Sequence, residues 1–254
     1  MAFLDVHFHS DALGRSVAVN VILPENVGTM IGMETTCSQG VKTIYLLHGL
    51  TDDHTTWMRR SSIERYATER GIAVVMPNVD RSWYTDTTYG AKYFTYVTEE
   101  LPEICGKFFK QISGKREDTY IAGLSMGGYG AVKAALTYPE KYAGCASLSG
   151  ALDVQECYKK YAQGEWESIF GDVRYEGSRH DVFALANTVG ERCAQLPKVF
   201  MWCGLDDGLL DCNRRFHDHL EKLNVPHAYT ESEGRHAWKW WDIHIQNAID
   251  YLLK

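Results

Sequence analysis

Residues 119–132, TYIAGLSMGGYGAV, contain the pattern Gly-x-Ser-x-Gly between a short apolar run and the start of a helix rich in small residues. A serine flanked in this way, entered from a strand and left by a helix, is typical of a nucleophile elbow. The tight turn brings both flanking positions close to neighbouring backbone, where glycine avoids the clash that a Cβ would make. Because a five-residue pattern also arises by chance, the assignment of Ser125 as a nucleophile depends on finding its partners.

Short apolar runs precede and follow this stretch. Each is almost wholly apolar, as expected of a parallel strand buried on both faces. The runs are residues 42–47, 72–76, 119–123, 144–148 and 198–203, with a shorter one at 227–231. Helical patterns separate them, over residues 57–70, about 92–112, from 126 onward, 212–223 and about 240–253. The alternation predicts an α/β fold with a mostly parallel, doubly wound sheet and helices on both faces.

Two segments depart from this alternation. Residues 3–9 and 16–23 are strand-like and joined by a turn, which predicts an N-terminal antiparallel hairpin. Residues 153–196 form the longest stretch without a buried-strand pattern and are rich in tyrosine, tryptophan and charge. We interpret them as a small helical, cap-like insertion over the site. A chain of 254 residues is compatible with one α/β domain, so we expect residues 1–254 to form a single domain.

Composition and charge narrow the range of partners. The formal net charge is −7 and lysine and arginine form no block, whereas phosphate binding needs clustered positive charge. We therefore expect no nucleic-acid partner and no membrane partner. The first residues lack a continuous apolar segment, and no apolar run approaches the roughly 18 residues of a membrane span. These features predict a soluble cytoplasmic protein, and they leave homo-oligomerisation open.

The cysteines show no pairing pattern. Their number is odd and no Cys-x-x-Cys pair occurs, in a chain without an evident export signal. This pattern predicts free and mainly buried thiols. The seven are Cys37, Cys105, Cys145, Cys157, Cys193, Cys203 and Cys212.

Partners for Ser125 are expected just after later strands, because the carboxyl ends of parallel strands form the ligand crevice. Asp206 and Asp207 follow the run at 198–203, and His236 follows the last short strand. The order serine, acid, histidine is that of an α/β-hydrolase. In this hypothesis His236 takes the proton of Ser125 and an aspartate orients the imidazole. The pattern alone does not choose between the two aspartates.

An oxyanion hole needs two backbone N–H groups. One is expected from Met126, at the start of the helix that follows Ser125. The other is expected from Leu50, in the loop His48-Gly49-Leu50 after the run at 42–47. We interpret His48 as structural, with its ring hydrogen-bonded within this loop.

Other chemical patterns have simpler interpretations. His7 and His9 form a His-x-His pair on one strand face, but no matching histidines and acids occur at later strand ends, so we expect no metal site. Residues 52–54, Asp-Asp-His, are interpreted as a turn that caps the next helix. No pattern indicates a cofactor.

Aromatic residues near the expected site are candidates for substrate binding. Trp57, Trp83 and Tyr84 could stack on a sugar or a phenolic acid, although packing explains them equally well. Trp238, Trp240 and Trp241 are interpreted as packing of the final helix, with one of them a candidate for the pocket wall. The insertion is too small for the extended lid of a long-chain lipase, which favours short acyl groups.

Six blocks of sequence resemble the esterase D-like family of α/β-hydrolases, and small bacterial tributyrin esterases are the most similar members. The blocks are HGLTDDHTTW, VVMPNVDRSWYTD, GLSMGGYGAVKAAL, SLSGALD, CGLDDGLL and EGRHAWKWWD, in this order over nearly the whole chain. The family includes tributyrin esterases, S-formylglutathione hydrolases and acetylxylan or feruloyl esterases.

The resemblance implies a function and a set of site residues. It implies Ser125 as nucleophile, His236 as base and Asp207, rather than Asp206, as acid, with Leu50 and Met126 at the oxyanion positions. Trp83 stands where the family usually has phenylalanine, so the pocket shape is expected to differ. The implied activity is a serine carboxylesterase that acts on small-molecule esters, either short-chain acyl esters or acetyl and hydroxycinnamoyl esters of carbohydrates. An S-formylglutathione hydrolase-type thioesterase and an acyltransferase are the alternatives, and a non-catalytic binding module is disfavoured because no triad member is missing.

Overall fold

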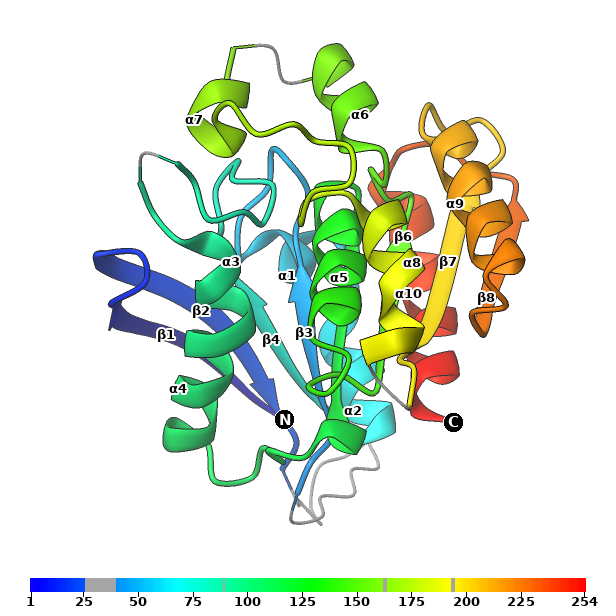
Figure 1. Cartoon of the computed structure of the whole chain (residues 1–254). Coiled ribbons are helices and arrows are strands. Elements are labelled where there is room, and N and C mark those ends of the chain that lie inside the picture. The colour runs from blue at the N-terminus through cyan, green and yellow to red at the C-terminus, as the bar shows by residue number, and fades with distance from the viewer. Residues whose placement is uncertain (26–39, 89, 162–163, 193–194) are drawn as a thin grey trace.

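The protein is built around one eight-stranded sheet with the strand order β1-β2-β4-β3-β5-β6-β7-β8 (Figure 1). The structure is a computed structural model, and it describes residues 1–25, 40–88, 90–161, 164–192 and 195–254. The strands are β1 (Ala2–Ser10), β2 (Arg15–Leu23), β3 (Thr43–Leu47), β4 (Ala73–Pro77), β5 (Thr119–Leu124), β6 (Gly144–Leu148), β7 (Lys198–Gly204) and β8 (His227–Ser232).

The strand directions confirm the predicted topology. β1 pairs antiparallel with β2, and β2 pairs antiparallel with β4, so the predicted hairpin extends one edge of the sheet. From β4 across to β8 every pair is parallel. The carboxyl ends of these six strands therefore lie at one edge, where the loops that follow them can meet.

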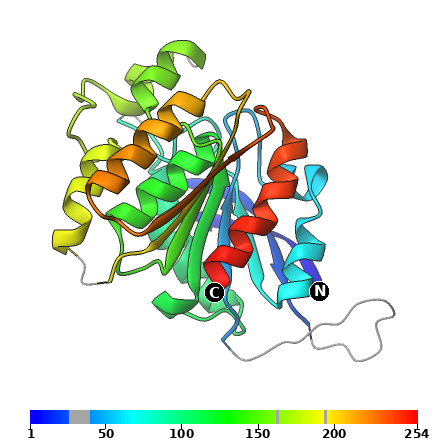
Figure 2. The same cartoon turned by 90° about the vertical axis from the view of Figure 1, so that its right-hand side faces the viewer.

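Helices cover both faces of the sheet. Figure 2 shows α10 and α2 to the right of the sheet and α5 and α9 to its left. The helices are α1 (Thr56–Arg60), α2 (Ile63–Arg70), α3 (Tyr93–Thr95), α4 (Leu101–Phe108), α5 (Met126–Thr137), α6 (Val154–Tyr161), α7 (Trp166–Phe170), α8 (Val182–Arg192), α9 (Leu210–Lys222) and α10 (Trp238–Leu253). The chain thus has the α/β-hydrolase architecture that the sequence predicts.

The central strands are apolar on both faces because each face carries its own core. In β3, all five residues are buried, and Tyr45 and Leu47 enter the core beneath α4, α5, α8 and α9. Ile44 and Leu46 alternate with them and enter the opposite core beneath α2 and α10. In the edge strand β1, by contrast, side chains alternate between exposed and partly buried.

The helix predicted over residues 57–70 is in fact two helices. The chain is extended at Ser61 (φ −137°, ψ 174°), between α1 and α2. The hydroxyl of Ser61 donates a 2.6 Å hydrogen bond to the carbonyl of Trp57, and the N–H of Ser62 donates to the carboxylate of Asp242 in α10. These side-chain bonds replace the backbone bonds of a continuous helix.

The helix predicted over residues 92–112 is also divided, and it ends earlier, at Phe108. A π-helical turn, Tyr96–Glu100, separates α3 from α4, and Pro102 lies in the first turn of α4. Proline lacks an N–H, so a regular helix through this position would lose a backbone hydrogen bond. The predicted helix start or kink at Pro102 therefore corresponds to a change of helix type.

The segment 153–196 has two different locations. α6 and α7 lie beyond the strand ends at the top of Figure 1, as expected of a cap. α8 instead packs against α5 and α9 and belongs to the helix layer on that face of the sheet. The expectation of a cap over the whole segment was therefore too broad.

Two further predictions concern cysteines and membranes. Cys105, Cys145, Cys157, Cys203 and Cys212 are free and buried, as predicted. Cys37 and Cys193 lie outside the described residues. In the described part of the chain, every helix is too short or too polar to cross a membrane.

Candidate active site

Ser125 occupies a strained turn between β5 and α5. Its backbone has φ 53° and ψ −118°, a conformation that is uncommon for a residue with a side chain. The N–H of Ser125 donates a 3.0 Å hydrogen bond to the carbonyl of Leu148 at the end of β6, which anchors the turn to the sheet. Strain of this kind costs about 1–3 kcal/mol and persists only where the surrounding structure enforces it.

The glycines at both sides of Ser125 are required by close backbone contacts. A Cβ on Gly127 would lie 2.5 Å from the carbonyl oxygen of Leu47, and a Cβ on Gly123 would lie 2.5 Å from the carbonyl carbon of Gly127. Both distances are far inside van der Waals contact. The two glycines therefore let α5 pack directly onto β3 and β5, as the sequence pattern predicts.

Ser125, His236 and Asp207 lie in a hydrogen-bonded row. Nε2 of His236 is 3.0 Å from Oγ of Ser125, and Nδ1 is 3.0 Å from Oδ2 and 3.1 Å from Oδ1 of Asp207. The carboxylate can only accept, so Nδ1 carries a hydrogen and Nε2 is free to accept from the serine hydroxyl. This is the arrangement of a nucleophile, a general base and an orienting acid.

The environment of Asp207 keeps it ionised. Its side chain is fully buried, which by itself raises the pKa. The hydrogen bond and charge interaction with His236, together with a 2.9 Å bond from the N–H of Leu209, outweigh burial and hold the pKa of Asp207 below its usual value. The neighbouring Asp206 is exposed, and its own N–H donates to Gly234.

Two residues to which no sequence pattern assigned a role stabilise the surroundings of Asp207. Asn213 in α9 is buried and donates to the carbonyls of Leu209 and Gly150, at 2.8 and 2.9 Å. Ser149, after β6, has a positive φ of 49°, contributes to the lowered pKa of Asp207 and accepts a 3.1 Å bond from the indole of Trp241. The family block SLSGALD contains Ser149, whereas no pattern marked Asn213.

The two expected oxyanion donors, Leu50 and Met126, line one cavity together with Ser125 and His236. Met126 begins α5, so its N–H belongs to the first helical turn, which has no acceptor within the helix. Leu50 lies in a turn closed by a 3.2 Å bond from the N–H of Asp52 to the carbonyl of Gly49. Neither the N–H of Leu50 nor that of Met126 has a protein acceptor among the described residues. Both are therefore free to bind an anionic oxygen.

His48 is structural, as expected. Its Nε2 accepts a 3.0 Å hydrogen bond from the N–H of Val79, and its Nδ1 lies 2.7 Å from the carbonyl of Gly49. Burial lowers the pKa of His48, which favours the neutral ring that this pair of bonds requires. The ring thus joins the loop after β3 to the loop after β4.

A cavity of about 610 Å³ opens onto Ser125 and His236. This volume suits a small-molecule ligand. Three tryptophans, Trp83, Trp238 and Trp241, contribute to its walls, and Leu50, Ala151 and Leu209 add apolar surface. One of the final-helix tryptophans was expected at the pocket, and two line it.

The structure contradicts two of the three tentative substrate contacts. Trp57 is buried in the core beneath α2 and α10, and its indole N–H donates a 3.0 Å bond to the carbonyl of Leu47. Tyr84 is also buried, and its hydroxyl donates to the carbonyl of His48. Both side chains use their polar atoms to position the end of β3 and the loop that follows it, and neither lines the cavity. Trp83 alone of the three does so.

The loop that carries Trp83 is anchored by the buried amino group of Lys133. Trp83 and Tyr84 both have positive φ, of 53° and 47°. The ammonium of Lys133 in α5 lies 2.8 Å from the carbonyl of Tyr84, 3.0 Å from Oγ1 of Thr85 and 3.3 Å from Nδ1 of His180. Burial lowers the pKa of Lys133 to about 7. The strained loop and the segment before α8 therefore share one anchor.

The first part of the insertion also reaches the cavity. Cys157 in α6 lines it, and Arg81 in the loop after β4 lines it from the other side. The guanidinium of Arg81 forms a 2.8 Å ion pair with Glu165, just before α7. This pair joins the cap to the rim of the site.

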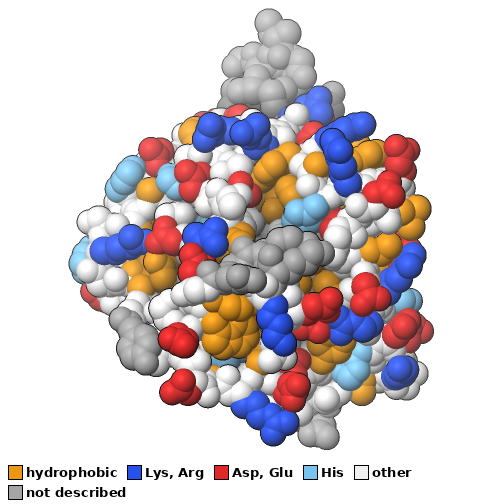
Figure 3. All heavy atoms as spheres, turned by 90° about the horizontal axis from the view of Figure 1, so that it is seen from above, with side chains coloured by type: hydrophobic (Ala, Val, Ile, Leu, Met, Phe, Trp, Pro, Cys, Tyr) orange, Lys and Arg blue, Asp and Glu red, His pale blue; other side chains and the backbone are white. Residues whose placement is uncertain are grey.

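Other predicted features lie away from the site or have structural roles. His7 and His9 are exposed, and each lies next to an acid of its own hairpin, at 3.3 and 3.8 Å. The carboxylate of Asp53 accepts bonds from Thr55 and Thr56 at the start of α1, as the capping interpretation expects. Figure 3, viewed from above the cap, shows basic and acidic side chains interspersed, without a block of one charge.

Comparisons with known proteins show what this chain and its fold are similar to. The model of the family described as "Putative esterase" matches residues 10–251. An acetyl esterase of Caldicellulosiruptor saccharolyticus is 32% identical, over 100% of this chain and 99% of its own. The structure is similar to that of FphF, a fluorophosphonate-binding serine hydrolase of Staphylococcus aureus, with a TM-score of 0.90, 38% identity and coverage of 100% and 98% of the two chains. It is also similar to S. aureus FrmB, named an S-formylglutathione hydrolase, with a TM-score of 0.88, 37% identity and coverage of 100% and 99%.

Proposed function

The chain belongs to the putative esterase family and is a carboxylic ester hydrolase of the serine-hydrolase type, and we propose that Ser125, His236 and Asp207 are its catalytic triad. The observation that carries this proposal is the continuous row from Ser125 Oγ through both ring nitrogens of His236 to the buried carboxylate of Asp207. The strained serine and the two free N–H groups support it.

In the proposed mechanism, Oγ of Ser125 attacks the ester carbonyl while Nε2 of His236 takes the hydroxyl proton. The carbonyl oxygen becomes negative and is bound by the N–H groups of Leu50 and Met126, each worth about 3 kcal/mol. His236 then returns the proton to the leaving alcohol, which gives an acyl-enzyme on Ser125. Water, activated by His236, hydrolyses this intermediate and restores the serine. Asp207 holds the imidazole in the productive tautomer and stabilises its protonated form.

We propose short-chain acyl esters as substrates, with acetyl and hydroxycinnamoyl esters of carbohydrates as the natural class. The three tryptophans around the cavity support this class, because indole rings stack on sugars and phenolic rings. Trp83 is the proposed substrate contact that remains from the sequence analysis. The similarity to a protein named acetyl esterase points in the same direction.

An S-formylglutathione hydrolase-type thioesterase is the second candidate, because the chain is 37% identical to S. aureus FrmB. Glutathione carries two carboxylates, so its recognition calls for cationic groups at the cavity. Arg81 lines the cavity, but it is already paired with Glu165. This pairing favours the carboxylesterase over the thioesterase.

The test compares wild type with Ser125→Ala on p-nitrophenyl acetate and p-nitrophenyl butyrate, with Ser16→Ala, an exposed strand serine, as control. We expect kcat to fall at least about a thousandfold in Ser125→Ala, because the triad acts as a unit, and to stay unchanged in the control. Equal rates in wild type and Ser125→Ala would exclude the proposed nucleophile. A second panel of acetyl-xylose, methyl ferulate and S-formylglutathione then ranks the substrate classes by kcat/KM.

A further inference from the structure

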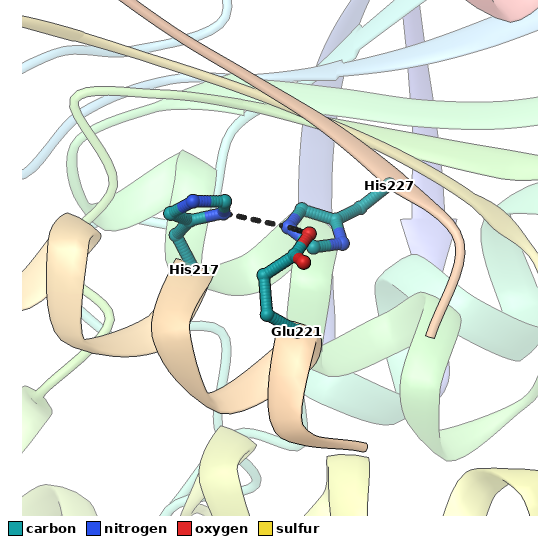
Figure 4. Close-up of side chains that lie close together, drawn as sticks. All are labelled: His217, Glu221 and His227. Carbon is teal, nitrogen blue, oxygen red and sulfur yellow. Dashed lines mark hydrogen bonds and ion pairs between the residues drawn. The ribbon is translucent and has the colours of Figure 1, made fainter. Parts of the chain in front are cut away.

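A second cluster of polar side chains lies on α9 and β8. His217 and Glu221 are one turn apart on α9, so they lie on the same helix face. His227 is the first residue of β8 and faces them across the short connection between the two elements. Figure 4 shows the two rings and the carboxylate turned toward one another. Their potential ligand atoms all lie within 4.8 Å of one another, and within the described part of the chain this is the one such group of three or more.

The hydrogen bonds of His227 determine which of its two ring nitrogens has a lone pair for a metal ion. Nδ1 of His227 is 2.8 Å from the carbonyl oxygen of Val225, which can only accept, so this nitrogen carries a hydrogen. In the neutral ring, Nε2 then has a lone pair. Nε2 lies 2.7 Å from Nδ1 of His217 and 3.6 Å from Oε1 of Glu221. A backbone carbonyl that orients a ring in this way is the usual second partner of a metal-binding histidine.

We propose that His217, Glu221 and His227 bind a divalent transition-metal ion of the zinc type. Two imidazole nitrogens and one carboxylate form a known zinc ligand set that leaves one position for water. With Zn–N distances of about 2.0–2.1 Å and tetrahedral angles, two nitrogen ligands lie about 3.3 Å apart. The two ring nitrogens, now 2.7 Å apart, need to separate by about 0.6 Å when the proton between them is replaced by the ion. Glu221 is exposed, so its side chain is free to adjust.

Of the two carboxylates near the histidines, Glu221 is the one available as a ligand. The nearby carboxylate of Glu231 accepts two bonds from Arg214, at 2.6 and 2.8 Å, and one from Tyr229 at 2.7 Å. Both oxygens of Glu231 therefore already accept hydrogen bonds from the protein. The ring of His217 packs against Tyr229, with centroids 4.8 Å apart, which restricts its orientation. One ring is thus oriented by a carbonyl and the other by packing, and such preorientation favours metal binding.

The cluster is separate from the catalytic centre. His227 starts β8 and pairs with Val199 near the start of β7, whereas Ser125 and Asp207 follow the ends of their strands. The cluster therefore lies at the amino-terminal ends of the parallel strands, whereas Ser125 and Asp207 lie at the carboxyl-terminal ends. An ion there would join α9, the helix after the acid loop, to the edge strand β8. We expect it to stabilise the fold without taking part in ester hydrolysis.

The test is titration of the metal-free full-length protein with ZnCl₂ by isothermal calorimetry, together with thermal unfolding at increasing Zn²⁺. Wild type is compared with His227→Gln, His217→Gln and Glu221→Gln. His7→Gln is the matched control, because His7 is an exposed strand histidine beside a carboxylate. We expect either histidine substitution to remove one equivalent of bound Zn²⁺ and its associated rise in Tm. Glu221→Gln should raise the Kd at least about tenfold, and the control should bind as wild type does.

Esterase activity and circular dichroism establish that the variants are folded. Glu221→Gln changes an exposed side chain, so it tests the site even if a histidine variant fails to fold. The proposal is overturned if wild type binds no Zn²⁺, if the three variants keep wild-type stoichiometry and Kd, or if His7→Gln loses as much binding. In those cases His217 and His227 form only a hydrogen-bonded pair.

Discussion

The most informative test of the site is the exchange of one oxygen for nitrogen in Asp207→Asn, with Asp206→Asn as the matched control. In the wild type both carboxylate oxygens lie within 3.1 Å of Nδ1 of His236, and Oδ1 also accepts the N–H of Leu209. An asparagine that keeps the bond with Leu209 places its NH₂ where Oδ2 was. That group donates to Nδ1 of His236, so the ring hydrogen moves to Nε2 and the ring no longer accepts the serine proton.

The size of the effect follows from the same distances. With Nδ1 and Oδ2 3.0 Å apart, the charge centres of the imidazolium and the carboxylate are about 4 Å apart, an attraction of about 4 kcal/mol at an effective dielectric constant of about 20. Loss of this attraction in the transition state lowers the rate about a thousandfold. The wrong tautomer adds to this, so we expect kcat to fall by a factor between about 10³ and 10⁴.

The assay is steady-state hydrolysis of p-nitrophenyl acetate at pH 7.5 with purified wild type and both variants. Asp206 is exposed, so Asp206→Asn should keep kcat within about twofold of wild type. Unfolding curves of the three proteins separate a loss of fold from a loss of chemistry. If Asp206→Asn loses more activity than Asp207→Asn, or if Asp207→Asn keeps wild-type activity, the assignment of the acid is refuted.

Two further predictions concern stability. Gly127→Ala should lower the free energy of unfolding by about 3 kcal/mol, because the added Cβ meets the backbone of β3. The control Gly106→Ala places its Cβ in open space on α4 and should raise the free energy of unfolding by up to about 1 kcal/mol. Equal effects of the two substitutions in urea unfolding would contradict the packing argument. Burial lowers the pKa of Lys133 from 10.5 to about 7, so the unfolded chain binds more protons between these values and stability should rise with pH. Lys133→Met should flatten this rise between about pH 7 and 8.5, and an unchanged slope in urea unfolding would contradict it.

Much of the fold could be predicted because the signals are local. Almost wholly apolar runs marked β3, β4 and β6, and their alternation with helices implied the parallel sheet. The predictions failed where side chains compete with the backbone: Ser61 interrupts a helical pattern, and Pro102 follows a π-helical turn. The placement of α8 in the cap was also wrong. Amphipathic periodicity shows that one face of a helix is buried, but it does not show which part of the protein covers that face.

For the site, three features could be predicted from the amino-acid sequence alone: the elbow, the order of the polar residues along the chain and the expected position of each at a strand end. These follow from local geometry, since the glycine pattern enforces the turn and parallel strands end at one edge. Family resemblance singled out Asp207, and the tertiary structure added the geometric reason, because only folding shows which carboxylate is buried against His236. The tertiary structure also showed that Trp83 lines the cavity, whereas Trp57 and Tyr84 hydrogen-bond to the backbone of the loop after β3. The direction of a side chain depends on contacts between residues far apart in the chain. For the same reason, the cluster of His217, Glu221 and His227 could be identified only from the tertiary structure.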